Sequence, residues 1–174
     1  MVARLNVLNS RELLAVLLAV RGADKAIQTQ IRKQTKAIAT PEWQQALAEQ
    51  ASTRLQHRVL VSTARVAVSN QNVRLSSATV GRPLRGGLDP KTLYYAPEFG
   101  ADRSKRTSYT ATSRRGRRFA VTNRRTAQQL PPRRRAGHVF GPAVASMVPR
   151  IAALWVQTVV RTMAEAFEGK RGDQ

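Results

Sequence analysis

The sequence YYAPEFGA (94–101) opens the stretch on which the fold of this chain depends, and GHVFGP (137–142) closes it. Between them, the segment 101–136 holds twelve Lys and Arg residues against one acid, Asp102, and so carries +11 of the net charge of +20. A dense charge of one sign repels itself and is not buried unpaired. We therefore expect this segment to lie in water or against a polyanion, while the flanking halves supply the core.

The composition indicates one domain that meets an acidic partner. The chain has 174 residues, 42% of them hydrophobic and only 5% aromatic, which suits a single aliphatic core. A net charge of +20 favours contact with nucleic acid, an acidic protein or an anionic surface. A highly charged surface that serves only solubility is the alternative. The absence of cysteine excludes disulfides, cysteine zinc sites and thiol catalysis.

Apolar runs in the chain are short. LLAVLLAV (13–20) resembles the apolar region of a signal peptide, but Glu12 precedes it and Arg21 follows it, so we favour a helix. The nearest approach to a membrane span, 142–160, contains Pro149, Arg150 and Gln157. We therefore expect no membrane partner.

Helices are predicted at both ends of the chain. Apolar spacing predicts amphipathic helices over 11–21, 24–39 and 149–168, the last ended by Gly169 and followed by a frayed tail, 169–174. Thr40-Pro41-Glu42 is a helix-start signal and predicts a separate helix that runs to about His57.

The middle of the chain has the pattern of short strands. These β-branched or alternating segments are 59–69, 73–80, 93–99 and 117–123. A turn at 70–72 joins the first two, 81–90 is a loop, 102–117 is an extended loop or hairpin tip, and 128–137 is extended. The predicted class is α+β: one domain, 1–174, with N- and C-terminal helices on a small antiparallel sheet and a long basic insertion, 101–136.

No motif predicts catalysis. His57 and His138 have no nucleophile or carboxylate at a useful spacing, and the ten acids form no metal-ligand cluster. We therefore expect no enzyme activity, no catalytic residue, no metal and no cofactor.

The cations of the insertion are the candidate contact residues, for nucleic acid or for carboxylates of neighbouring subunits. Tyr94, Tyr95, Tyr109 and Phe119 lie among them and offer rings for stacking on bases, although no base-reading signature is present. The candidate contacts are Arg103, Lys105, Arg106, Arg114, Arg115, Arg117, Arg118, Arg124, Arg125, Arg133, Arg134 and Arg135.

The apolar face of the predicted C-terminal helix is wider than one stripe. Such a face packs either against a second subunit or inside its own domain, and both readings stay open. The candidate interface residues are Leu154, Trp155, Val159 and Met163.

The order of these features resembles the small neck proteins of long-tailed bacteriophages (siphophages), known as head-to-tail connector or tail-completion proteins. In that family a turn usually reads Y-A-x-x-V-E-F-G-T, and a later junction ends in P-A. The matching residues here are Tyr95, Ala96, Glu98, Phe99 and Gly100, followed by Phe140, Pro142 and Ala143. The chain departs from the pattern at Pro97 and Ala101 and in its arginine-rich insertion.

The resemblance implies a structural virion protein at the head–tail junction, made in the host bacterial cytoplasm. It implies a homo-oligomer, typically a hexameric ring, that contacts neighbouring neck and tail proteins and the DNA channel. Two alternatives stay open: a tail terminator in the same neck stack, and a free protein that binds nucleic acid without sequence preference.

Overall fold

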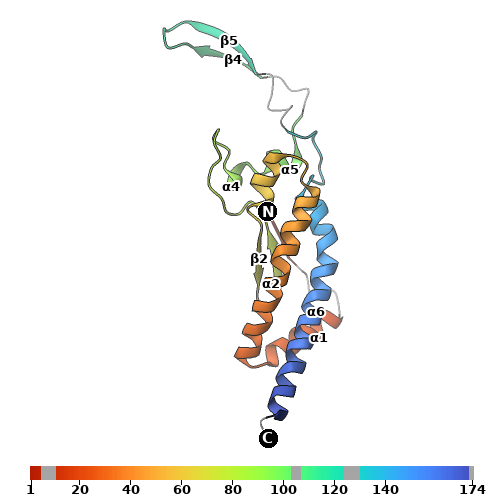
Figure 1. Ribbon diagram of the computed structural model, residues 1–174. Helices are drawn as coiled ribbons and strands as arrows, with labels where there is room; N and C mark the ends of the chain where they lie inside the picture. Colours follow the sequence, from red (N-terminus) through yellow and green to blue (C-terminus); the bar gives the residue numbers. More distant parts are fainter. Residues whose placement is uncertain (5–10, 103–106, 124–129, 173–174) are drawn as a thin grey trace.

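Two long antiparallel helices dominate the fold. The computed structural model describes residues 1–4, 11–102, 107–123 and 130–172. Within these ranges, α2 (Lys25–Gln50) and α6 (Phe140–Gly172) pack side by side and run in opposite directions beside a small antiparallel sheet (Figure 1). The shorter α1 (Arg11–Gly22) lies against α6. The predicted α+β class is confirmed.

The main sheet has three antiparallel strands in the order β1-β3-β2. The strands are β1 (Val2–Arg4), β2 (Arg65–Val68) and β3 (Val73–Ser76), with Val66 opposite Leu75. The predicted turn at 70–72 is confirmed: Ser69 N donates to the Asn72 carbonyl at 2.9 Å. The pairing of β1 with β3 was not predicted, because three residues carry no readable pattern.

The helix α2 runs straight through the start signal at Pro41, so the prediction of two separate helices is wrong. Thr40 does not cap a new helix; its hydroxyl donates to the Lys36 carbonyl one turn earlier, at 2.7 Å. Pro41 is exposed, whereas Ala39 and Trp43 beside it are fully buried. Burial of this face outweighs the cost of an interior proline, whose missing hydrogen bond and ring clash together amount to about 3 kcal/mol.

The strand predicted over 59–69 begins too early. Residues 54–61 form one short helical unit, α3 (Arg54–Gln56) followed by the wider turn η2 (His57–Val61). A capping box starts it, in which Thr53 accepts a bond from Gln56 N at 3.2 Å. Val59 and Leu60 are fully buried, so their β-branched and apolar character reflects the core and not a strand.

The strand predicted over 93–99 is also wrong. This segment forms two short helices, α4 (Pro90–Leu93) and α5 (Tyr95–Phe99). Asp89 caps the first by accepting a bond from Lys91 N at 2.9 Å, and Pro90 is at its first position. The Asp-Pro pair is a helix-start signal that we assigned to the preceding loop.

The C-terminal helix α6 is longer than predicted at both ends. It begins at Phe140, continues through Pro149 and Gly169, and reaches Gly172, so most of the expected frayed tail is helical. By length and composition alone, Phe140–Glu168 would suffice to cross a membrane, contrary to our reading of the apolar runs. Core helices of globular proteins reach the same length and apolar content, and α6 packs on α2 as a core helix would.

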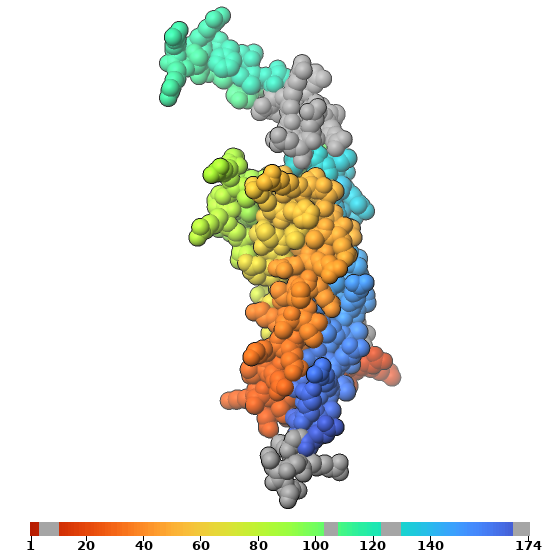
Figure 2. Space-filling model, in the orientation of Figure 1, coloured from red at the N-terminus to blue at the C-terminus, as the bar shows by residue number. Residues whose placement is uncertain are grey.

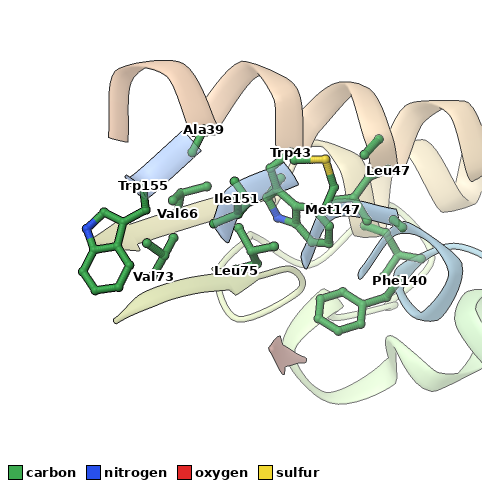
Figure 3. Close-up of a cluster of buried hydrophobic side chains, with 14 of the residues drawn as sticks. Ala39, Trp43, Leu47, Val66, Val73, Leu75, Phe140, Met147, Ile151 and Trp155 are labelled. Atoms are coloured by element: carbon green, nitrogen blue, oxygen red, sulfur yellow. The ribbon is translucent and has the colours of Figure 1, made fainter. Parts of the chain in front are cut away.

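Trp43 is at the centre of the core. Figure 3 shows side chains from α2, α6 and the sheet meeting around it, with Leu47, Leu75 and Met147 close by. Its ring packs edge-on against Phe140, with centroids 5.5 Å apart, and its Nε1 donates to the Ser76 carbonyl at 3.0 Å. The side chain of Trp43 thus connects α2 to the sheet and to the start of α6.

The arginine-rich insertion contains a second, separate hairpin. Its strands, β4 (Thr107–Thr112) and β5 (Arg118–Asn123), pair over six positions. Figures 1 and 2 show the hairpin standing away from the body, beyond α5. The strand predicted at 117–123 and the hairpin-tip reading of 102–117 are confirmed within the described residues.

Candidate interaction site: the arginine-rich hairpin and its anchor

The site is anchored by one buried carboxylate, Glu98 in α5. Its side chain is fully buried and accepts hydrogen bonds from three successive backbone N–H groups at the start of α6. The distances are 3.2 Å to Val139 N, 2.9 Å to Phe140 N and 3.2 Å to Gly141 N. These N–H groups have no partner within the helix and carry its positive dipole end, so a carboxylate there acts as a charged cap.

Two glycines let the backbone approach this carboxylate and close the base of the insertion. Gly137 has φ +78°, and a Cβ atom there would collide with Glu98 Oε1. Gly100 has φ +73°, and a Cβ atom there would collide with the carbonyl oxygens of Pro131 and Pro132. Any other residue would push these segments apart, so the base depends on glycine at both positions.

The chain leaves for the insertion and returns from it at the same place. Ala101 N donates to the Pro131 carbonyl at 3.0 Å, and Arg134 N donates to the Phe99 carbonyl at 2.8 Å. His138 N donates to the Glu98 carbonyl at 2.9 Å, and a ring nitrogen of His138 lies 2.8 Å from the Pro132 carbonyl. His138 therefore has a packing role beside the cap.

A second buried polar side chain, Gln56, also holds α5 in place. Its Nε2 donates to the Pro97 carbonyl at 3.0 Å, while its Oε1 accepts from Ser52 N at 3.0 Å and Thr53 N at 3.1 Å. Gln56 is fully buried, so each of these bonds replaces one with water. Our sequence reasoning missed Gln56, although the spacing T-x-x-Q is the signature of a capping box.

The tip of the hairpin is a tight arginine-bearing turn. Ser113 N donates to the Arg117 carbonyl at 2.9 Å, and Gly116 N donates to the Ser113 carbonyl at 2.9 Å. Gly116 has φ +76° and open space around it, as expected for the left-handed position of a three-residue hairpin loop. The exposed cations around this turn are Arg114, Arg115, Arg117 and Arg118.

The remaining predicted contact residues divide into two groups. Arg133, Arg134 and Arg135 are exposed and lie at the base of the insertion, and the first of them follows Arg118 of the tip group by 15 positions (133 − 118). Arg103, Lys105, Arg106, Arg124 and Arg125 lie outside the described residues. The structure therefore brings the cations together as a tip cluster and a base cluster.

The two motifs quoted for the resemblance meet in space. Glu98 from the first motif caps the helix that the second motif begins, and the fully buried Ala143 continues that helix into the core. Tyr95 is about half exposed on the outer side of α5. The first motif therefore orders the start of α6.

The candidate interface residues on α6 also separate. Trp155 and Val159 are buried in the core of their own chain and are not available to a partner. Leu154 and Met163 are half-buried. Leu154 lines a surface groove of about 480 Å³ between α2 and α6. Of the four candidate residues, Leu154 and Met163 are therefore the two that a partner can reach.

Among the residues that the structure describes, no three His, Cys, Asp or Glu side chains gather where they would hold a metal ion. No protein-family model, curated protein or solved structure matches this chain.

Proposed function

We propose that this chain is a structural protein of the head–tail junction of a long-tailed bacteriophage, where copies form a closed ring between the DNA-filled head and the tail. The observation that carries the proposal is the bond between the two motifs of the resemblance. Glu98 of the first motif holds Phe140 N of the second at 2.9 Å. A direct contact gives a physical reason for both short motifs to occur in one chain.

The exposed arginines suit a protein that works inside an assembly. The insertion has twelve cations and one acid, so it cannot neutralise itself. Arginine forks bind carboxylates of neighbouring subunits or phosphates of DNA through paired, charge-assisted hydrogen bonds. A ring of identical copies repeats the same head-to-tail contact until rotation closes it, which places every arginine tip in an equivalent position.

The experiment is a hairpin replacement in the phage that encodes this chain. Residues 103–129 are replaced by a short Gly-Ser linker, which leaves the base between Ala101 and Pro132 in place. We expect DNA-filled heads and free tails by electron microscopy, while the purified variant keeps its helical circular dichroism. The matched control replaces only Ser108 and Thr122 by alanine and should give normal particles. Absence of the wild-type protein from the neck of purified particles would overturn the proposal.

Sequence-independent nucleic-acid binding is the second candidate, and one observation favours it. Tyr109 and Phe119 are about half exposed on the same hairpin as the arginines, and such rings stack on bases. This candidate predicts that the isolated chain binds single-stranded DNA with an affinity that falls steeply with salt. Retained affinity in the hairpin replacement, or a flat salt dependence, would reject it.

A further inference from the structure

The hairpin has one apolar face and one polar face. In an antiparallel pair, directly opposed residues share a face, and Tyr109 is opposite Val121 while Ala111 is opposite Phe119. These four side chains form the apolar face. The other face carries Ser108 opposite Thr122 and Thr110 opposite Ala120, with a hydroxyl contact of 3.4 Å between the first pair.

The apolar face is uncovered in the single chain. Tyr109 is 52% exposed and Phe119 is 48% exposed, and Figure 2 shows the hairpin apart from the body. An isolated two-stranded hairpin is marginally stable in water and needs a surface to pack on. We therefore expect a surface of another molecule to cover this apolar face.

A groove of matching character runs along the seam of α2 and α6. Its first half, about 480 Å³, is lined by Glu42, Glu49, Arg150 and Ala153 among others. Its second half, about 350 Å³, is more apolar and includes Ile38. Leu154 and Gln157 line both halves, so the two lie next to each other along the seam. Figure 2 shows α2 and α6 adjacent on one face of the molecule.

Length and charge of the hairpin fit this groove. Ile38 and Glu49 are about 16 Å apart along α2, at about 1.5 Å per residue. Tyr109 and Thr112, the last residue of β4, are about 10 Å apart at about 3.4 Å per residue, and the side chains of the tip arginines reach further. A hairpin laid along the groove therefore brings its aromatic pair to the apolar half when its arginine tip reaches the acidic half. The two exposed acids, Glu42 and Glu49, are two helical turns apart on α2.

We propose that the β4–β5 hairpin of one copy lies in the α2–α6 groove of a neighbouring copy. Its aromatic face then packs near Ile38 and Leu154, and its tip arginines pair with Glu42 and Glu49. This inference rests on the proposed function, which supplies the closed, repeated contact between copies. Because the donor and acceptor surfaces are different, the contact is head-to-tail, as a ring requires.

Directed cross-linking tests the contact, because the chain has no cysteine of its own. One variant carries Tyr109→Cys on the apolar face and Gln157→Cys in the groove. Its matched control carries Thr110→Cys on the polar face of the same strand, again with Gln157→Cys. We expect oxidation of the assembled protein to give a ladder of covalent oligomers for the first pair. The yield for the control should be at least about tenfold lower, since its thiol faces away from the groove.

Mixing separates contact between copies from contact within one chain. Equal amounts of the single variants Tyr109→Cys and Gln157→Cys should give covalent dimers containing both and nothing larger. A cross-link confined to one chain, or a ladder equal to that of the Thr110→Cys control, would overturn the inference.

Charge reversal gives an independent readout. The pair Glu42→Arg and Glu49→Arg should weaken self-association at least about tenfold, and adding Arg114→Glu and Arg115→Glu should restore it. No rescue by the combined variant would count against the arginine–carboxylate pairing.

The outcomes also separate this inference from the proposed function. A neck ring in particles without the cross-link overturns the groove contact alone. A cross-linked ladder from a protein that is absent from particles overturns the phage role and leaves the groove contact standing.

Discussion

The carboxylate of Glu98 offers the sharpest test of how the two motifs are coupled. Glu98→Ala leaves the N–H groups of Val139, Phe140 and Gly141 without their acceptor. Val139 N and Phe140 N are buried, and each buried orphan costs about 1–3 kcal/mol, so the pair costs about 2–6 kcal/mol. Gly141 N is only partly buried, so we expect water to replace its acceptor in the variant. We therefore expect a loss of about 4 kcal/mol in the free energy of unfolding, a large part of a typical total of about 5–15 kcal/mol.

Urea unfolding measures this loss, followed by circular dichroism and by the fluorescence of Trp43 and Trp155, both fully buried. Glu98→Gln keeps one acceptor oxygen but removes the charge at the helix start, so we expect an intermediate loss of about 2 kcal/mol. The matched control is Glu168→Ala, an exposed glutamate on α6 outside the groove and the base, which should stay within about 0.5 kcal/mol of wild type.

Hydrogen exchange locates the effect. In Glu98→Ala the amides of Val139 and Phe140 should exchange faster, while those at the centre of α2 keep their relative protection. If Glu98→Ala cost less than about 1 kcal/mol, the same as its control, the reasoning that this carboxylate holds α6 would be refuted.

Three further predictions concern single positions. Gly100→Ala should lower the free energy of unfolding, measured with urea, by at least about 2 kcal/mol, because the new Cβ atom meets two proline carbonyls. The control is Gly86→Ala, at φ +103° in open space, which should lower it by only about 1 kcal/mol. Pro41→Ala should raise the thermal midpoint, with a gain of about 1–3 kcal/mol, since α2 regains a hydrogen bond; no gain would contradict the cost assigned to this proline. Gln56→Leu should lower the free energy of unfolding, measured with urea, by about 2–4 kcal/mol. An unchanged value would show that the buried hydrogen bonds of Gln56 do not stabilise the fold.

Sequence patterns predicted the elements that depend on local spacing. The long C-terminal helix and the strand at 117–123 follow from residue patterns that are typical of helices and strands, and the turn at 70–72 follows from Asn70-Gln71-Asn72 between two strand-like segments. The errors occurred where a local signal competed with burial. Thr40-Pro41-Glu42 is a valid start signal, yet the fully buried Trp43 and Leu47 keep α2 continuous through it.

The anchor of the site could be predicted only in part. The residues of both motifs were singled out, but nothing in their spacing shows that Glu98 meets Phe140 N across 42 positions of the chain. A lone glutamate in a short apolar segment is equally compatible with an exposed turn. The signal that was available lay in Gly137 and Gly100, because each needs a positive φ and space that only a glycine leaves.

The placement of the cap explains how the fold accommodates so large a charged insertion. The base closes through Ala101 N to the Pro131 carbonyl and Arg134 N to the Phe99 carbonyl, directly beside the buried Glu98. A force applied to the hairpin is therefore transmitted first to α5 and to the start of α6. Because α6 packs along α2, the start of α6 is in turn supported by the contact between these two helices. A neighbouring copy that holds the hairpin would thus pull first on α5 and on the start of α6, the two elements that close the base.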